Sequence, residues 1–289
     1  MAASRPRTSS AASSLPRACG LGLRAPHYDA ILAGAPDVPF FEVLAENHTT
    51  LGDPAREILT RVRERWPVTL HCVGMSLGST DPLDFEHLGR LRELEHRLEP
   101  ALVSDHLSWS SLDGRFLHDL LPLPYLEESI AHVSARIARV QDFLGRRIAI
   151  ENVSSYATFA ESELAEWEFL SAVAERADCS ILLDVNNVHV SAVNHGFSAE
   201  TYLDALPRER VAQLHIAGFS RGRELLLDSH GAAIDPAVWR LLELALERFG
   251  ALPFVLERDR NIPPLSELLD EAKKASALIA RRVTRDDLE

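Results

Sequence analysis

Residues 180–184 read Ser-Ile-Leu-Leu-Asp, a short apolar run that ends in a carboxylate. An uninterrupted apolar run of this length is typical of a strand in a parallel sheet, because helices cover both faces of such a sheet. Further runs of the same kind alternate with longer stretches of helical periodicity. The eight predicted strands are Cys19–Arg24, Phe40–Ala45, Pro67–Cys72, Ala101–Ser104, Ile148–Glu151, Ser180–Asp184, Val211–His215 and Pro253–Glu257.

The segments between these runs carry helix signals. Apolar residues recur at helical spacing over Ser129–Phe143 and Leu265–Ala280. Asp53-Pro54 and Asp235-Pro236 each place a capping carboxylate before a proline suited to a first helical turn, and Gly250 is placed to end a helix. Eight strands with intervening helices predict a (β/α)₈ TIM barrel rather than an open, doubly wound sheet.

Length and composition fit one domain of this kind. The chain has 289 residues with 46% hydrophobic content, and (β/α)₈ barrels typically run to about 250 residues. Two domains are possible on length alone, but no Gly/Ser- or Pro-rich linker divides the interior. We therefore expect a barrel at 19–282, a disordered tail at 1–18 that is rich in Ser, Ala and Arg, and a short tail at 283–289.

Charge and cysteine content narrow the function classes. A formal net charge of -13 argues against nucleic acid as a partner, since phosphate binding requires a basic surface. The three cysteines form no CxxC pair and no disulfide framework, which favours a reducing, cytoplasmic location. No apolar run approaches the roughly 18 residues of a membrane span, so no membrane partner is expected.

Polar side chains suited to metal binding fall at the carboxyl ends of the predicted strands. In a barrel these ends form one rim around a single mouth, where active sites occur. The side chains would therefore face one pocket although they are scattered in sequence. They are His71, His106, Glu151, Asp184, Asn187, His215 and Glu257, with Asp228 and His230 in the loop after the seventh strand.

Such a cluster predicts bound cations. Several unpaired carboxylates and imidazoles in one pocket are costly through desolvation and repulsion, and mixed His/carboxylate ligation suits iron, zinc or manganese. Any one of these residues alone is more simply a hydrogen-bonded core residue, but the recurrence on successive strands favours a metal site. The number of candidates exceeds the need of one ion, so two or three metals are implied.

Other histidines are interpreted differently. Those in charge-rich helical segments, His87, His96 and His132, are predicted to be solvated. For His48, substrate binding and a plain loop role are equally open. His118 lies in a long connection suited to a lid. His189 and His195 follow the sixth strand, where either could support a ligand or simply belong to a loop.

Two short motifs are decoys. Residues 74–78 match the GxSxG nucleophile elbow, but that elbow requires a helix directly after the serine. Here helical periodicity begins only near Phe85, so a flexible rim loop is favoured over a serine hydrolase. Gly20-Leu21-Gly22 lacks the third glycine of a dinucleotide site and instead predicts close packing of the first strand.

Several stretches together resemble the multinuclear non-haem iron-dependent oxidative enzymes, whose best-known members make oxazolone–thioamide groups in the copper-binding peptide methanobactin. The resemblance runs from about Gly20 to Asp259. Its most specific pieces are Gly20–Arg24, Phe41–His48, Ser104–Trp109, His118–Pro124, Glu151–Tyr156, Asp184–Val188 and Asn194–Phe197.

The resemblance implies a barrel of the xylose-isomerase-like superfamily that holds two or three irons of mixed ferrous and ferric state, with dioxygen as co-substrate. Such enzymes remodel cysteines of a ribosomally made precursor peptide into oxazolone–thioamide or thiooxazole-type groups, and a separate recognition protein often presents the peptide. The implied ligands are the nine rim residues given above. Glu151, as a bridging carboxylate, and His106 are the implied catalytic residues, and Arg24, Glu46 and Asn47 are candidates for orienting the substrate. Asn187 stands where methanobactin-type relatives carry His, so two irons are the safer expectation.

Two other functions remain open at this point. A metal-dependent hydrolase or isomerase, such as an endonuclease-type phosphodiesterase or a sugar isomerase, would use the same rim cluster on the same barrel. A non-catalytic metal-binding protein would use it without turnover. Metal identity and oxygen consumption separate these alternatives.

Overall fold

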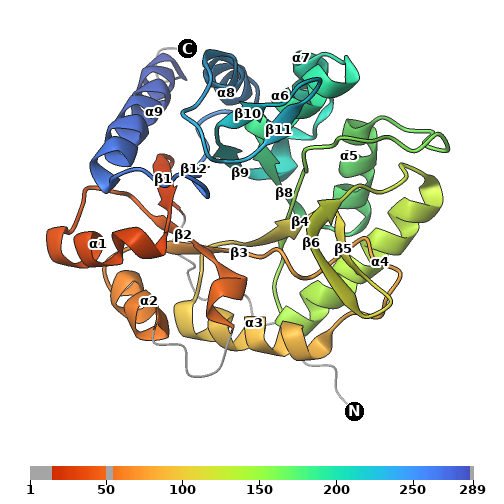
Figure 1. Cartoon of the computed structure of the whole chain (residues 1–289), viewed down its shortest axis with the longest axis horizontal. Helices are drawn as coiled ribbons and strands as arrows, with labels where there is room; N and C mark the ends of the chain where they lie inside the picture. The colour runs from red at the N-terminus through yellow and green to blue at the C-terminus, as the bar shows by residue number, and fades with distance from the viewer. Residues whose placement is uncertain (1–14, 50–54, 287–289) are drawn as a thin grey trace.

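The computed structural model describes residues 15–49 and 55–286, and the side chains of 280–286 are not described. The tail expected at 1–18 and the Asp53-Pro54 helix start lie largely outside these residues. Within them, eight parallel strands close into a barrel in the order β1-β12-β9-β8-β7-β4-β3-β2, which confirms the predicted fold (Figure 1). The strands are β1 Cys19–Gly22, β2 Phe41–Leu44, β3 Val68–His71, β4 Val103–His106, β7 Ala149–Glu151, β8 Ser180–Asp184, β9 Val211–Ile216 and β12 Phe254–Leu256.

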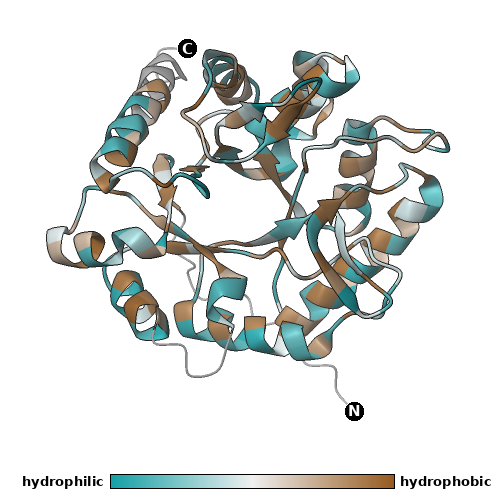
Figure 2. Cartoon of the chain, in the orientation of Figure 1, coloured by the Kyte–Doolittle hydropathy of each residue, from teal (hydrophilic) through white to brown (hydrophobic). Residues whose placement is uncertain are grey.

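Helices surround the strands and bury their apolar faces against them (Figure 2). The α-helices are α1 Tyr28–Gly34, α2 Ala55–Arg63, α3 Phe85–Leu98, α4 Glu127–Leu144, α5 Glu166–Arg176, α6 Val185–His195, α7 Ala199–Ala205, α8 Pro236–Phe249 and α9 Leu265–Asp286, with short 3₁₀ turns at η1 Ala25–His27, η2 Ala45–His48 and η3 Arg208–Arg210. Helix α9 runs to Asp286 and so continues into the range expected as a C-terminal tail, and residues of this helix lie close to β1. None of the helices described is both long and apolar enough to cross a lipid bilayer.

Helix ends follow the sequence signals. At the start of α8, the Asp235 side chain accepts a hydrogen bond from the Ala237 amide, and Pro236 is the first residue of the helix. At its end, α8 is followed by Gly250, which has a positive φ. Asp184 is both the last residue of β8 and the N-cap of α6, since its Oδ1 accepts the Asn187 amide at 2.8 Å. Strand and helix thus join without a loop, and this fixes Asp184 at the mouth of the barrel.

Strand register aligns the rim residues side by side. His106 pairs with Glu151, and Asp184 pairs with His215. The fourth strand was predicted as Ala101–Ser104 but runs two residues later, as β4, because Ser104 pairs with His71 and Ala149 on its two neighbours. His106 is therefore part of the strand rather than of the loop after it.

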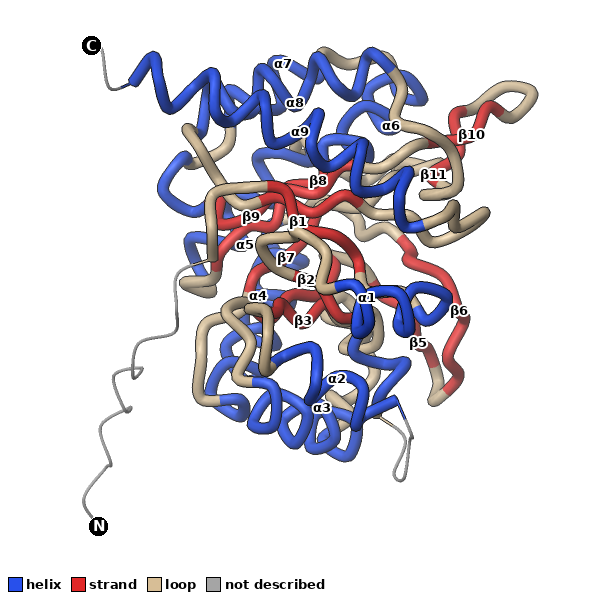
Figure 3. The backbone as a smooth tube through the Cα atoms, turned by 90° about the vertical axis from the view of Figure 1, so that its left-hand side faces the viewer, coloured by secondary structure: helices blue, strands red, loops and turns tan. Residues whose placement is uncertain are grey.

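Two hairpins absent from the predicted elements project from the same side of the barrel (Figure 3). One pairs β5 Trp109–Leu112 with β6 Arg115–Leu121, and the other pairs β10 Phe219–Arg221 with β11 Leu226–Asp228. Each follows the carboxyl end of a barrel strand, β4 and β9 respectively. The hairpins consequently extend the rim that carries the candidate ligands.

The two decoy motifs have structural roles. The Ser76 hydroxyl is buried and accepts hydrogen bonds from the amides of Ser110 and Ser111, so it anchors the rim loop to the β5 hairpin. Helix α3 begins only at Phe85. Gly20 lies against the Phe40 ring, where an added Cβ would approach a ring carbon to 2.6 Å. The first-strand glycine therefore permits close packing, as predicted.

Candidate metal centre

Glu151 lies at the centre of the rim cluster. Its Oε2 is 3.2 Å from His71 Nε2 and 3.2 Å from His106 Nε2, and its Oε1 is 3.2 Å from His215 Nδ1. The carboxylate is only 1% exposed. One buried carboxylate at the end of β7 thus contacts imidazoles from three other strands.

A second group of ligand atoms surrounds His230, in the segment after β11. His230 Nε2 lies 2.8 Å from Asp228 Oδ1 and 3.7 Å from Asp184 Oδ2. Its Nδ1 lies 3.3 Å from Glu257 Oε2 and 3.2 Å from Asp259 Oδ2. The β10–β11 hairpin therefore brings its own carboxylate and imidazole to the strand ends of β8 and β12.

Three overlapping sets of side chains have donor atoms close enough to hold a metal ion, with every atom in a set within 4.8 Å of the others. Glu151 and His215 belong to two sets, and Glu257 also belongs to two. Shared carboxylates are what bridging between neighbouring cations requires. The sets are His71, Glu151 and His215; Glu151, Asp184, His215 and Glu257; and His230, Glu257 and Asp259.

The donor atoms fit bound cations better than they fit one another. Several are buried and make no hydrogen bond to any described residue. A buried polar atom left in this way costs about 1–3 kcal/mol, more when charged. A divalent or trivalent cation would compensate all of them together. The atoms are Glu151 Oε2, Asp184 Oδ2, Asn187 Oδ1, His215 Nδ1 and His230 Nε2.

Burial and the close spacing of charged groups also shift the pKa values of residues in the cluster. Burial, with Glu151 and Asp228 nearby, raises the pKa of Asp184 to about 7 although the neighbouring imidazoles oppose the shift. Burial alone would lower the pKa of His106, but the Glu151 and Asp105 carboxylates outweigh it and raise the pKa to about 9. Without metal, the raised pKa values of Asp184 and His106 therefore favour the protonated forms of these two side chains.

Asn187 lies in the first turn of α6, three residues after Asp184. Its amide nitrogen donates to the Asn152 carbonyl at 3.1 Å, which leaves the buried Oδ1 without a hydrogen bond to any described residue. An amide oxygen is a neutral ligand, weaker than a carboxylate for a hard cation. The side chain could accept a metal ion but would hold it less tightly than its charged neighbours.

Two acidic residues near the cluster were not singled out from the sequence. Glu42 is buried in the middle of β2, and its Oε1 lies 2.8 Å from His215 Nε2. Its Oε2 accepts hydrogen bonds from Thr69 and Gln213. Asp259 follows Glu257 by two residues and joins the set around His230. The sequence contained a signal for both residues. Glu42 is an acidic residue in a strand that ends at the rim, and Asp259 is an acidic residue two positions after the rim candidate Glu257.

The residues expected to orient the substrate lie in different surroundings. Arg24 binds the Asp259 carboxylate and lies 3.6 Å from Glu257 Oε1, so it is joined to the charge network of the cluster. Glu46 accepts the Gly74 amide and lies 3.2 Å from His87 Nε2, while Asn47 is exposed. The prediction of a solvated His87 is wrong, because α3 turns this face of the helix toward η2.

Four further histidines differ in their exposure to solvent. His96 is 71% exposed at its side chain, and the exposed His132 donates to the Ser79 carbonyl at 2.8 Å. His48 is buried beside the Tyr28 hydroxyl, and His118 lies on the exposed β6 strand beside Phe116.

Comparison with known proteins assigns the chain to a protein family. The model of the family described as "RiPP precursor modification enzyme MbnB/TglH/ChrH" matches residues 18–280. The chain belongs to this family. RiPP denotes a ribosomally synthesised and post-translationally modified peptide. The match to the MbnB/TglH/ChrH family spans the barrel, both hairpins and the rim of this chain.

Relatives of this chain carry names without an activity. This chain is 52% identical over 258 residues to a UPF0276 protein of Rhizorhabdus wittichii, covering 89% of this chain and 92% of that protein. It is 50% identical over 261 residues to a UPF0276 protein of Anaeromyxobacter sp., covering 90% and 92%.

Solved structures extend the fold assignment beyond the MbnB/TglH/ChrH family. Endonuclease IV from Thermus thermophilus superposes with a TM-score of 0.58 at 19% identity, covering 93% of this chain and 99% of that chain. A fusion of a xylose isomerase-like TIM barrel with a 4-hydroxyphenylpyruvate dioxygenase gives a TM-score of 0.58 at 14% identity, covering 88% of this chain and 40% of that chain. These similarities show the fold, a closed barrel of parallel strands surrounded by helices, and nothing beyond the fold.

Proposed function

We propose that this protein is a multinuclear non-haem iron oxidase that uses dioxygen to modify cysteine residues of a ribosomally made precursor peptide. The observation that carries the proposal is the set of three overlapping His/carboxylate groups at the mouth of the barrel. Membership of a family of RiPP precursor modification enzymes supplies the substrate class. The expected product is an oxazolone–thioamide or thiooxazole-type heterocycle.

The ligands in this proposal are the nine rim residues implied by the sequence, and the convergence of His and carboxylate side chains at the strand ends supports them. The mixed imidazole and carboxylate donors suit iron, and the amide of Asn187 makes two ions a safer expectation than three. Bound iron would supply the Lewis acidity that favours a cysteine thiolate and the redox chemistry with dioxygen. The proposed ligands are His71, His106, Glu151, Asp184, Asn187, His215, Asp228, His230 and Glu257.

The chain's own residues would hold and shield the site. Glu151, with one oxygen toward His71 and His106 and the other toward His215, is the proposed bridging carboxylate. Its near-complete burial, and that of Asp184 and His215, keeps bulk water from the base of the pocket. Arg24 would balance the acidic side of the cluster and, with Glu46 and Asn47, orient the peptide at the rim.

The proposal includes a cytoplasmic setting and a partner. The three cysteines of the chain are buried and unpaired, which suits a reducing compartment. A separate peptide-recognition protein is expected to deliver the precursor to the mouth.

The deciding experiment begins with anaerobic purification and metal analysis. The iron-loaded protein is then incubated with the cysteine-containing peptide encoded beside its gene and with any recognition protein encoded there. We expect an oxygen-dependent loss of mass from the peptide. Glu151→Gln should abolish this loss and lower the iron content, whereas Glu163→Gln, at an exposed site on the following loop, should change neither.

Three results would contradict the proposal. Bound zinc with phosphodiesterase activity and no oxygen consumption would indicate a hydrolase of the endonuclease type. An unmodified peptide, with iron fully loaded and the partner present, would remove the oxidase assignment. Lower metal content in Glu151→Gln without any turnover in the wild type would indicate a metal-binding protein without catalysis.

A further inference from the structure

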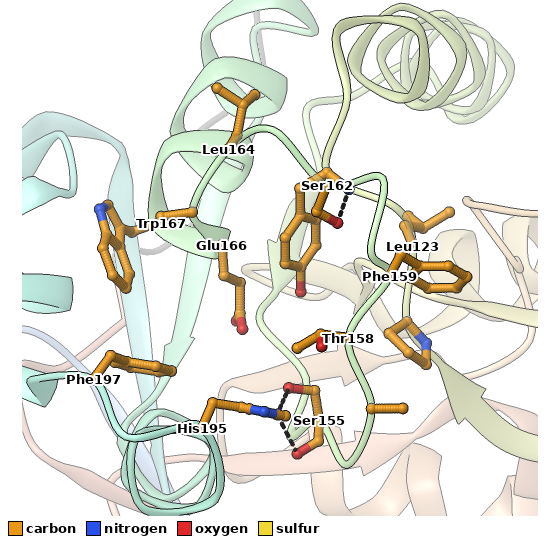
Figure 4. A pocket seen from close by; sticks show the side chains of 14 residues that line it. Leu123, Ser155, Thr158, Phe159, Ser162, Leu164, Glu166, Trp167, His195 and Phe197 are labelled. Carbon is orange, nitrogen blue, oxygen red and sulfur yellow. Dashed lines mark hydrogen bonds between the residues drawn. The ribbon is translucent and has the colours of Figure 1, made fainter.

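A cavity of about 230 Å³ opens on the side of the barrel where β7, the strand that ends at Glu151, leads into α5. Its walls come from the β6–α4 connection, the β7–α5 loop, the start of α5 and the end of α6 (Figure 4). The proposed metal chemistry uses none of the residues that line it. The cavity has room for one long side chain rather than for a folded segment.

Part of the cavity wall comes from stretches that the family resemblance singled out. His118–Pro124 contributes Leu123, Glu151–Tyr156 contributes Ser155, and Asn194–Phe197 contributes His195 and Phe197. Ser155 and His195 hold two of these walls together, with Ser155 Oγ 2.8 Å from His195 Nε2.

The cavity and the metal cluster share one loop. Glu151 ends β7 in the cluster, and Ser155, four positions later, lines the cavity. Between them, the Ser154 hydroxyl donates a hydrogen bond to Asp228 Oδ2 at 3.4 Å. The hydroxyl of Tyr156, the residue after Ser155, accepts a hydrogen bond from the Asp228 amide at 2.9 Å. A peptide whose cysteine lies at the cluster could follow this loop, and a neighbouring side chain could then enter the cavity.

The chemistry of the cavity is aromatic with one buried acid. Tyr125, Phe159, Trp167 and Phe197 contribute aromatic surface to its lining. Glu166 is nine-tenths buried, and its carboxylate points into the space between Trp167, Phe197 and His195 (Figure 4). The Tyr202 hydroxyl donates to Glu166 Oε1 at 2.9 Å.

Within the described residues, Glu166 has hydrogen-bonding partners but no ion pair with lysine or arginine. Burial raises the pKa of Glu166 to about 7, against the opposing effect of hydrogen bonds from Tyr202 and Tyr125. Burying a carboxylate without a cation is unfavourable, and a cation placed in the cavity would stabilise its charged form. Aromatic faces also attract ammonium and guanidinium groups.

We propose that this cavity binds the basic side chain, arginine or lysine, of a residue close to the modified cysteine in the substrate peptide. The aliphatic stem would lie against the aromatic walls, and the charged end would pair with Glu166. An apolar side chain would fill the same walls but leave the buried carboxylate uncompensated. The peptide as the source of this side chain rests on the proposed function, whereas the selectivity for a basic group rests on the cavity itself.

The test uses small probes that contain no cysteine. The protein is labelled with 5-fluorotryptophan, and the Trp167 resonance is assigned by its loss in Trp167→Phe. N-acetyl-arginine N-methylamide and N-acetyl-norleucine N-methylamide are then titrated separately and followed by ¹⁹F NMR. We expect the arginine probe to shift the Trp167 resonance saturably, and to bind at least about 10-fold more tightly than norleucine, because a charge-assisted hydrogen bond adds to the apolar contact.

Two variants define the role of the acid. Glu166→Gln keeps an oxygen that can accept from Tyr202, and it should weaken the arginine probe about 10-fold while leaving the norleucine probe unchanged. Glu163→Gln, an exposed acidic residue three positions earlier, should have no effect. The resonances of Trp66, Trp109 and Trp239, which lie outside the cavity, report whether each variant remains folded.

The outcomes separate this proposal from the function proposed above. Equal binding of both probes, or unchanged arginine binding in folded Glu166→Gln, would overturn the basic-side-chain site. Absence of any Trp167 shift while the precursor peptide is still oxidised would also overturn it, and would leave the oxidase intact. Selective arginine binding together with an unmodified precursor would support the cavity as a cation site and remove the oxidase.

Discussion

Glu42 shows how one buried residue can determine the ligand chemistry of another. Its Oε1 lies 2.8 Å from His215 Nε2, and its other oxygen is held by Thr69 and Gln213. Because Nε2 of His215 approaches this carboxylate, Nδ1 is the nitrogen that faces Glu151 and Glu257, and a proton held on Nε2 would leave Nδ1 free to bind a metal. The arrangement is that of a carboxylate–histidine–metal triad, in which the carboxylate selects the tautomer and raises the basicity of the ligand.

Replacing this carboxylate should weaken metal binding without removing a ligand. We expect Glu42→Gln to lower iron affinity by about 10–100-fold, measured by competition with a chelator of known affinity. Glu93→Gln, on the exposed face of α3, is the matched control and should leave the affinity unchanged. An unaltered affinity in Glu42→Gln would show that the tautomer of His215 is set by other contacts.

Glu166 predicts a pH-dependent stability. Burial raises the pKa of its carboxyl from 4.5 to about 7 in the folded protein, where Tyr202 and Tyr125 face it. The stabilisation by the bound proton is complete below pH 4.5 and is lost as pH rises through 7. Glu166→Gln, compared at equal metal content, should therefore gain roughly 1–3 kcal/mol of unfolding free energy over the wild type between pH 4.5 and pH 8. Urea unfolding at both pH values measures it, and a difference independent of pH would contradict the buried, proton-binding carboxyl.

At the same scale, the sequence predicted the rim residues and missed the layer beneath them. Side chains two positions apart in a strand point the same way, so Thr69 and Gln213 face inward together with His71 and His215. Thr69 and Gln213 hold the Glu42 carboxylate, but both residues lie inside apolar runs, where the hydrophobic pattern predicts core side chains. The prediction for His87 failed for a different reason, because helical periodicity shows which face is charged but not which neighbour covers it.

At the scale of elements, the β10–β11 hairpin positions part of the cluster. Asn194, near the end of α6, bonds both backbone groups of Leu226, accepting its amide at 2.9 Å and donating to its carbonyl at 3.1 Å. Asp228 lies two residues further along β11. The end of one helix therefore fixes the hairpin whose last residue faces His230.

Asn194→Ala should loosen this hairpin while the barrel stays folded. We expect faster amide hydrogen exchange across residues 219–230 and a lower iron content, since the side of the cluster formed by Asp228 and His230 would lose its register. Val193→Ala, at a neighbouring side chain that is 54% exposed, should alter neither quantity. Unchanged exchange in Asn194→Ala would indicate that the hairpin is held by the contacts of β10 and β11 alone.

The elements found from sequence and those missed differ in how much they bury. The eight barrel strands are largely apolar and buried, and they produce nearly uninterrupted runs, which is why their order and number could be predicted. The hairpins expose much of their surface, including Phe116, Leu117 and Leu227, and so lack a clear hydrophobic period. Gly218 illustrates a constraint that no local pattern contains, because its Cα lies against the carbonyl of Ala232, where a Cβ could not fit.

At the scale of the whole molecule, the barrel brings together charges that oppose its own folding. Closing eight parallel strands places every carboxyl end on one rim, so residues between His71 and Glu257 in sequence meet in a single buried cluster. The sequence predicted that convergence because strand ends are fixed by topology. It could not predict distances, which depend on hairpin docking and on the register between strands.

Metal binding should therefore be linked to the stability of the entire barrel. A ligand that binds only the folded state stabilises it by about 2.7 kcal/mol at a free concentration 100 times its Kd. For a domain of this size that corresponds to a rise in Tm of roughly 4–5 °C. We expect ferrous iron, added anaerobically to chelator-treated protein, to produce a rise of this order by differential scanning calorimetry.

The variant that distinguishes specific from adventitious binding is Glu151→Gln, because this carboxylate belongs to two of the three ligand sets. It should lose most of the iron-dependent rise in Tm, whereas Glu93→Gln should retain it. Both variants are also measured without iron, because Glu151 lies 3.2 Å from the imidazoles of His71, His106 and His215 and its replacement also changes the charge balance of the metal-free protein. An equal iron-dependent rise in both variants would locate the stabilising ion outside the mouth of the barrel.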